Sequence, residues 1–224
     1  MTYDIRIAKE QDFRSIRDIW EEQFPADPEY QDIIFGKVLP LCKSYILSSN
    51  EEILTVVSLM PMNYVSSDYT HQDLKGWYMF GVATKKGSEG KGLASTLLKY
   101  ILSEESINGY DFIFERPANQ SLINFYLKFG FTKFIKKYPY TFHSAGSKIN
   151  VNSILRDIAN KFKRRFEWGS TELLENLIEL GEIDRHQELQ TAESFMEECF
   201  IAVKPLNNTP EAVFSEAFFC FPLE

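Results

Sequence analysis

The sequence predicts an α/β protein in which helices flank a mixed central sheet, with a smaller α+β segment after it. Short apolar runs typical of strands alternate with stretches whose hydrophobic residues recur at helical spacing. A glycine-rich segment joins one of these strands to one of these helices. The composition, 44% hydrophobic and 25% charged, is typical of a folded protein, and 224 residues allow one large domain or two small ones.

The individual elements follow from periodicity and from residues that start or stop helices. In the first helix Phe13, Ile16, Trp20 and Phe24 recur on one face, and Gly130 is a suitable C-terminal cap for a later helix. The expected strands are 3–8, 44–48, 53–65, 74–84, 110–115, 131–135, 138–142, 199–203 and 212–221. The expected helices are 12–24, 28–42, 92–104, 119–129, 151–166 and 171–180.

A polar, glycine-containing stretch at 144–150 is the best candidate for a domain boundary. We therefore expect a first domain at 1–143 and a C-terminal α+β segment at 144–224. The formal net charge is −8, and residues 139–224 carry 14 acidic against 8 basic side chains. Solvent-exposed helix faces are the simple explanation of this acidity. The functional alternative is an acidic rim that attracts a cationic substrate.

Composition also excludes several classes of protein. The acidic excess argues against a nucleic-acid partner, and no apolar stretch approaches the roughly 18 to 20 residues of a membrane span. Cys42, Cys199 and Cys220 form no Cys-x-x-Cys pair, which indicates a reducing cytoplasm. The three histidines are scattered, so no metal site is expected.

The glycine-rich segment carries the clearest chemical signal. Gly87, Gly90 and Gly92 stand between an apolar strand and a helix, with three lysines nearby. Glycines let a backbone turn its N–H groups toward a ligand, and a helix N-terminus adds unsatisfied donors, so this segment suits a diphosphate. The spacing fits neither a Walker loop nor a Rossmann fingerprint. An ordinary tight turn is the alternative.

Two segments resemble signatures of the GNAT N-acyltransferase superfamily. Glu89-Gly90-Lys91-Gly92-Leu93-Ala94 is similar to its acyl-CoA loop, Gln/Arg-x-x-Gly-x-Gly/Ala, and 117–131 is similar to its Asn…Phe-Tyr-x-x-x-Gly-Phe segment. The resemblance covers roughly residues 3–143. It implies a splayed sheet and acetyl-CoA, or another short acyl-CoA, as co-substrate without a metal.

The resemblance also assigns the donor site. Gly81 would mark a bulge that opens a slot for the pantetheine arm. Asn119 would meet the pantetheine, although a helix N-cap is its structural alternative. Glu89 departs from the family pattern, which has Gln or Arg at this position. Its carboxylate would lie near an anionic ligand. The expected acyl-CoA-binding residues are Val82, Ala83, Thr84, Gly87, Glu89, Gly90, Lys91, Gly92, Leu93, Ala94, Ser95 and Asn119.

Three residues are candidates for catalysis. By the resemblance Tyr126 would be the general acid for the departing sulfur, with a core aromatic as the alternative. Glu115, at the end of a strand, is a candidate general base, with an exposed strand end paired with Arg116 as the alternative. The segment Pro117-Ala118-Asn119 resembles the enhanced-intracellular-survival-type branch, which would bring the carboxylate of Glu224 into the site. The apolar run that ends at Glu224 suits a core strand equally well. A proton relayed by solvent, with no dedicated base, is a further alternative.

The resulting hypothesis is an N-acyltransferase in which a primary amine attacks the thioester directly. The acceptor would be a small amine, such as a polyamine or an aminoglycoside-like compound, or a basic peptide. A non-catalytic acyl-CoA-binding sensor or scaffold is the alternative from another class. No membrane partner is expected, and a homo-oligomer is compatible with the sequence.

Overall fold

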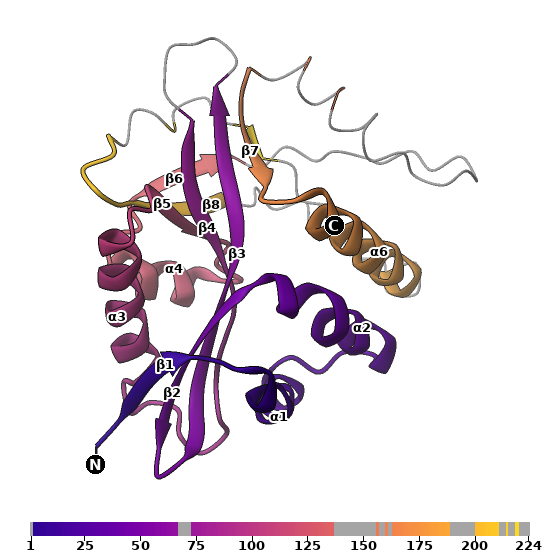
Figure 1. Ribbon diagram of the computed structural model, residues 1–224, viewed down its shortest axis with the longest axis vertical. Helices are drawn as coiled ribbons and strands as arrows, with labels where there is room; N and C mark the ends of the chain where they lie inside the picture. The colour runs from indigo at the N-terminus through magenta and orange to yellow at the C-terminus, as the bar shows by residue number, and fades with distance from the viewer. Residues whose placement is uncertain are drawn as a thin grey trace.

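In the computed structural model, helices cover both faces of one mixed sheet (Figure 1). The structure describes residues 2–66, 73–136, 156, 160, 163–188, 200–210, 214 and 218–219. The strands are β1 (Asp4–Ile7), β2 (Lys43–Ser49), β3 (Glu52–Ser66), β4 (Leu74–Thr84), β5 (Phe112–Glu115), β6 (Lys133–Lys136), β7 (Arg164–Trp168), β8 (Phe200–Pro205) and β9 (Phe218–Phe219). The helices are α1 (Phe13–Gln23), α2 (Pro28–Ile33), α3 (Leu93–Ile107), α4 (Gln120–Leu127) and α6 (Thr171–Glu188).

The main path of the sheet runs β1-β2-β3-β4-β5-β8-β6. Neighbours on this path are antiparallel except for the parallel pair β4 and β5. The long strand β3 also pairs with β7, through residues 62–66, and β9 pairs with β7. Three described strands from beyond residue 143, β7, β8 and β9, therefore lie in the same sheet as the N-terminal strands. The domain boundary near 144 stays a prediction, because 137–155 lie outside the described residues.

Alternate side chains of the strands build two hydrophobic cores, one on each face of the sheet. Tyr78 of β4 and Phe114 of β5 face the core formed with α1, α2 and α6. Met79 of β4 and Ile113 of β5 face the core formed with α3 and α4. The layers are therefore helix, sheet, helix, which confirms the predicted fold class.

The structure corrects the sequence analysis in two places. Residues 164–166, expected to end a helix, belong instead to β7, whose pairing with residues 62–66 of β3 overrides the local helical pattern. The helix expected at 28–42 is broken into α2, a π-helical turn at Ile34–Val38 and a 3-10 turn at Leu39–Leu41. Pro40 lacks an N–H group, so a regular helix cannot continue through it.

Part of the expected secondary structure falls beyond the described residues. The strand expected at 138–142 and most of the stretch 144–162 are among these. Within the described part of the chain, the helices are too short or too polar to cross a membrane.

Candidate active site

The glycine-rich segment forms an open loop between β4 and α3 (Figure 1). Gly87, Gly90 and Gly92 have positive φ angles of 80°, 72° and 76°, and a Cβ atom added at any of them would meet nothing within 4 Å. Gly92 is the N-cap of α3, and no side chain caps this helix end. The first-turn N–H groups of α3 thus lack an intrahelical partner, as an anion-binding loop requires.

Acidic side chains surround this loop. Glu52 pairs with Lys85, and Glu22 of α1 accepts a hydrogen bond from the N–H of Lys86 at 3.0 Å. Lys91 Nζ donates to the carbonyl of Gly87 at 2.9 Å, so it braces the loop from within. The loop therefore combines open backbone donors with two lysine side chains that already have partners, the carboxylate of Glu52 for Lys85 and the carbonyl of Gly87 for Lys91.

Glu89, the departure from the family pattern, is exposed and turned onto the loop. Its Oε1 accepts a hydrogen bond from Gln23 Nε2 at 3.1 Å. Hydrogen bonding from its own backbone N–H is the largest cause that lowers the pKa of Glu89, and the amide of Gln23, the N–H of Gly87 and the charge of Lys86 act in the same direction. The carboxylate is therefore ionised in the free protein and held by nearby donors.

Next to this loop, β4 separates from its neighbour β5. The parallel pairing of β4 with β5 covers 76–78 and 112–114, and among the described residues no strand pairs with that side of β4 from 79 to 84. On its other side, β4 has a register shift against β3, where Ser58 pairs with Phe80 and Val56 with Ala83. The β-bulge expected at Gly81 is therefore present.

Gly81 is required at this bulge for two reasons. Its φ of 60° lies in the left-handed region, which costs other residues energy. An added Cβ would also lie 1.8 Å from Cζ2 of Trp20, so the indole ring of α1 packs directly on the bulge. Trp20 is buried, and its Nε1 has no hydrogen-bond partner among the described residues. In the sequence, the helical spacing of Trp20 indicates only a core position.

Glu115 lies where β4 and β5 stop pairing. Its side chain is only 3% exposed, and its Oε1 has no hydrogen-bond partner among the described residues. Burial raises the pKa of Glu115 to about 9. The alternative given for Glu115, an exposed strand end, is wrong: β5 lies between β4 and β8 within the sheet, and the side chain is buried. A buried carboxyl group with a strongly raised pKa is a typical candidate for a functional group.

Tyr126 of α4 lies near this carboxyl group. It is 5% exposed, and burial, followed by the charge of Glu115, raises the pKa of its hydroxyl group. Its ring packs edge-on against Phe131 and Phe125. Burial agrees with both interpretations of Tyr126, while the electrostatic coupling to Glu115 favours the functional one. The assignment as general acid stays a prediction.

Tyr78 is a third ionisable group at this point, and the sequence analysis did not single it out. It is buried on β4 and stacks on Phe114 with ring centroids 5.0 Å apart. Burial raises the pKa of its hydroxyl group, Arg116 opposes this, and Glu115 adds to it. Tyr78 and Tyr126 belong to opposite cores, and the charge of Glu115 acts on the hydroxyl groups of both. A tyrosine within the apolar strand 77–80 was the only available signal.

Two other predicted site residues have different outcomes. Asn119 is the N-cap of α4, with its Oδ1 accepting from the N–H of Leu122 at 3.0 Å, which confirms the structural alternative. Its contact with pantetheine stays a prediction. Glu224 lies outside the described residues.

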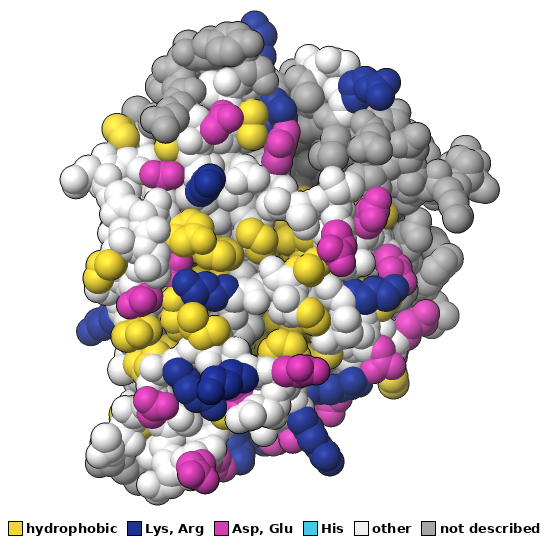
Figure 2. Space-filling model, viewed as in Figure 1, with side chains coloured by type: hydrophobic (Ala, Val, Ile, Leu, Met, Phe, Trp, Pro, Cys, Tyr) yellow, Lys and Arg dark blue, Asp and Glu magenta, His cyan; other side chains and the backbone are white. Residues whose placement is uncertain are grey.

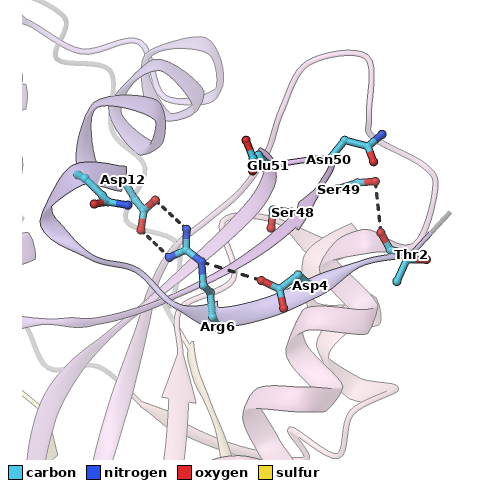
Figure 3. Close-up of a pocket in the computed structure, with 9 residues that line it drawn as sticks. Thr2, Asp4, Arg6, Asp12, Ser48, Ser49, Asn50 and Glu51 are labelled. Carbon is cyan, nitrogen blue, oxygen red and sulfur yellow. Dashed lines mark hydrogen bonds and ion pairs between the residues drawn. The ribbon is translucent and has the colours of Figure 1, made fainter.

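A polar cavity of about 530 Å³ lies away from these groups, at the β1 edge of the sheet (Figure 3). Arg6 forms two hydrogen bonds to Asp12 there, at 2.6 and 2.9 Å. None of the predicted site residues lines this cavity. Across the described residues, no three His, Cys, Asp or Glu side chains are grouped to hold a metal ion.

The surface also has an apolar area near the point where β4 and β5 separate. Figure 2 shows hydrophobic side chains gathered across the middle of one face, where Figure 1 places α4, β4 and the neighbouring α1 and α2 helices. On β4 and α4, the half-buried hydrophobic residues include Phe80, Val82, Leu122 and Phe125. An apolar surface of this kind suits the uncharged arm of a ligand whose charged end binds elsewhere.

These features define an α/β protein with an open glycine-rich loop beside the point where two sheet strands separate. A family model described as Acetyltransferase (GNAT) domain matches residues 4–134, more than half of the chain. The chain therefore belongs to the GNAT acetyltransferase family.

Solved structures show the same fold. A probable N-acyltransferase of unknown function from Enterococcus faecalis is 18% identical, with a TM-score of 0.51 over 62% of this chain and 33% of that one. A GCN5-related N-acetyltransferase from Kribbella flavida is 10% identical, with a TM-score of 0.53 over 78% of this chain and 49% of that one. This chain thus spans a third to a half of these two proteins. A comparison with curated proteins gave no match.

Proposed function

We propose that this protein transfers an acetyl or other short acyl group from acyl-CoA to a primary amine. The observation that carries the proposal is the position of Glu115 and Tyr126. Both are buried and electrostatically coupled at the point where β4 and β5 separate, and the glycine-rich loop follows at the end of β4. A thioester whose diphosphate lies on the loop and whose arm follows β4 would reach this point.

Each group has a defined task in this reaction. The amine nitrogen forms a bond to the thioester carbon, the carbon–sulfur bond breaks, and CoA leaves as a thiol. Glu115 accepts the proton lost by the nitrogen, and Tyr126 donates a proton to the sulfur. Glu115 is protonated in the free protein at neutral pH, because its pKa is about 9. A bound ammonium group would lower that pKa and favour the carboxylate that the reaction needs.

The acceptor is proposed to be a cationic amine, either a small polyamine or aminoglycoside-like compound or a basic peptide. We further propose that 144–224 covers the acceptor side. In support, Trp168 at the end of β7 packs edge-on against Tyr78, with ring centroids 5.8 Å apart. Assignment to the enhanced-intracellular-survival-type branch is part of the proposal and rests on the segment 117–119.

The test combines binding with turnover. Thermal shift measures binding of CoA and acetyl-CoA, and thiol release measures turnover with a panel of cationic and neutral amines. We expect Tyr126→Phe to lower kcat by about 100-fold, in the range for loss of a general acid, while CoA still binds. Tyr100→Phe is the matched control, because Tyr100 lies on the exposed side of α3 and packs against Tyr45.

The outcomes separate the alternatives. Binding of CoA without thiol release for any amine would favour the sensor and contradict the transferase. Turnover that Tyr126→Phe leaves unchanged would remove Tyr126 from the mechanism. Absence of CoA binding would contradict both the transferase and the sensor.

A further inference from the structure

The C-terminal end of α1 lies against the glycine-rich loop. Gln23, the last residue of α1, uses its amide nitrogen twice: Nε2 donates to the carbonyl of Thr84 at 2.9 Å and to Glu89 Oε1 at 3.1 Å. A side-chain amide carries two hydrogen atoms on this nitrogen, so both are engaged. Gln23 thereby joins α1 to the end of β4 and to the loop.

The carboxylate of Glu89 lies against the loop that the proposed function assigns to the diphosphate, with its Oε1 3.1 Å from Gln23 Nε2. It lies close enough to the loop for its own N–H and that of Gly87 to lower its pKa. A diphosphate bound by the same N–H groups would be repelled by this carboxylate, so the carboxylate must leave. Glu89 is exposed, and solvent is available to it once it moves.

When Glu89 leaves, one hydrogen atom of Gln23 Nε2 loses its acceptor. The hydrogen bond to Thr84 keeps the amide at the edge of the loop, with the second N–H directed to the space that the carboxylate has vacated. Charged oxygen atoms accept hydrogen bonds from amides more strongly than neutral ones do. A diphosphate oxygen is therefore a better partner for this hydrogen than water.

We propose that Gln23 binds the diphosphate of acyl-CoA, and that Glu89 occupies its amide and the loop until the diphosphate displaces it. This inference rests on the proposed function and assigns a binding residue to α1, outside the loop. It also accounts for the acidic residue in the loop, since Glu89 then acts as an internal competitor for the site.

The test is a double-mutant cycle on CoA affinity with Gln23→Met, Glu89→Gln and both together. Isothermal titration uses CoA and, in parallel, pantetheine, which has no diphosphate. We expect Glu89→Gln to tighten CoA binding by about tenfold, because it removes a negative charge beside the ligand. This gain should shrink as salt rises from low to high concentration. Gln23→Met should weaken CoA binding by about fivefold, for loss of one donor to a charged oxygen.

The two changes should not be additive. In the native background, Gln23→Met also releases Glu89 and so partly offsets the lost contact. We therefore expect Gln23→Met to weaken CoA binding more in the Glu89→Gln background than in the native one. Pantetheine affinity should stay unchanged throughout. Glu172→Gln, the same change of charge in the first turn of α6, is the matched control.

Three other outcomes of the titrations would overturn the role of Gln23. If native protein binds CoA and Gln23→Met leaves the affinity unchanged in both backgrounds, Gln23 is not a diphosphate ligand. Equal weakening of CoA and pantetheine would show that the change only distorts the protein around β4, and it would also overturn the inference. If native protein binds no CoA, the proposed function fails together with this inference.

Discussion

Glu115 at the end of β5 and Tyr126 on α4 are both buried; burial raises the pKa of the Tyr126 phenol, and the charge of the Glu115 carboxylate raises it further. This electrostatic coupling links β5 to α4, the helix that carries the second family signature at 117–131. A proton on Glu115 removes this effect, so the protonation state of one group influences the other. The pH dependence of the protein should reflect this pair.

The first prediction concerns the rate against pH. A general base acts when deprotonated, and the pKa of Glu115 is about 9 in the free protein. We therefore expect kcat/KM to rise by up to about tenfold per pH unit below pH 9 and to level off above it. An acceptor amine that stays neutral over the range keeps its own titration out of the measurement. Glu115→Gln should lower the rate and abolish this limb; a limb that persists in this variant would assign the titration to another group.

The second prediction concerns stability against pH. The folded-state pKa of Glu115, about 9, lies above its ordinary value of 4.5, so between these values the folded protein binds more protons than the unfolded chain. The contribution of Glu115 to the free energy of unfolding must then fall as pH rises, by at most about 1.4 kcal/mol per pH unit. Urea unfolding at pH 6, 7.5 and 9, on native protein and Glu115→Gln, measures it. Identical slopes for the two proteins would contradict the raised pKa.

The third prediction concerns Glu105, a carboxylate of α3 with no exposed surface. It accepts hydrogen bonds from Lys43 at 2.6 Å, Trp77 Nε1 at 2.8 Å and the hydroxyl group of Tyr45. Glu105→Ala leaves these donors without an acceptor and should lower the free energy of unfolding by about 3 to 5 kcal/mol. The control, Glu104→Ala, lies beside it on α3 and should change that free energy by less than about 0.5 kcal/mol. Equal effects in urea unfolding would mean that the buried cluster adds nothing.

The fourth prediction separates two glycines. Gly81→Ala combines a left-handed backbone with a clash against Trp20 and should cost about 2 to 5 kcal/mol of unfolding free energy. Gly87→Ala has a similar φ but open space around it, so only about 1 to 2 kcal/mol is expected. Thermal unfolding of both variants gives the difference. If Gly87→Ala lowers the unfolding free energy as much as Gly81→Ala does, the packing of Trp20 on the bulge does not contribute to stability.

The sequence was most informative where a single local pattern decides the structure. The positive φ of Gly87, Gly90 and Gly92 and the N-cap role of Asn119 depend on neighbouring residues alone, and all are present. Strand β7 was missed because its pairing partner, β3, lies about 100 residues away. Tyr78 was missed because its relation to Glu115 arises only when β4 and β5 lie side by side.

By itself, the sequence determined the α/β layers and the glycine-rich junction, because hydrophobic period and glycine conformation are local properties. It also placed Tyr126 and Glu115 as candidates. The tertiary structure decided that Glu115 is buried, that β4 and β5 separate beside it, and that Gln23 reaches Glu89 from α1. These relationships join segments far apart in the chain, and burial and electrostatic coupling exist only once folding brings such segments together.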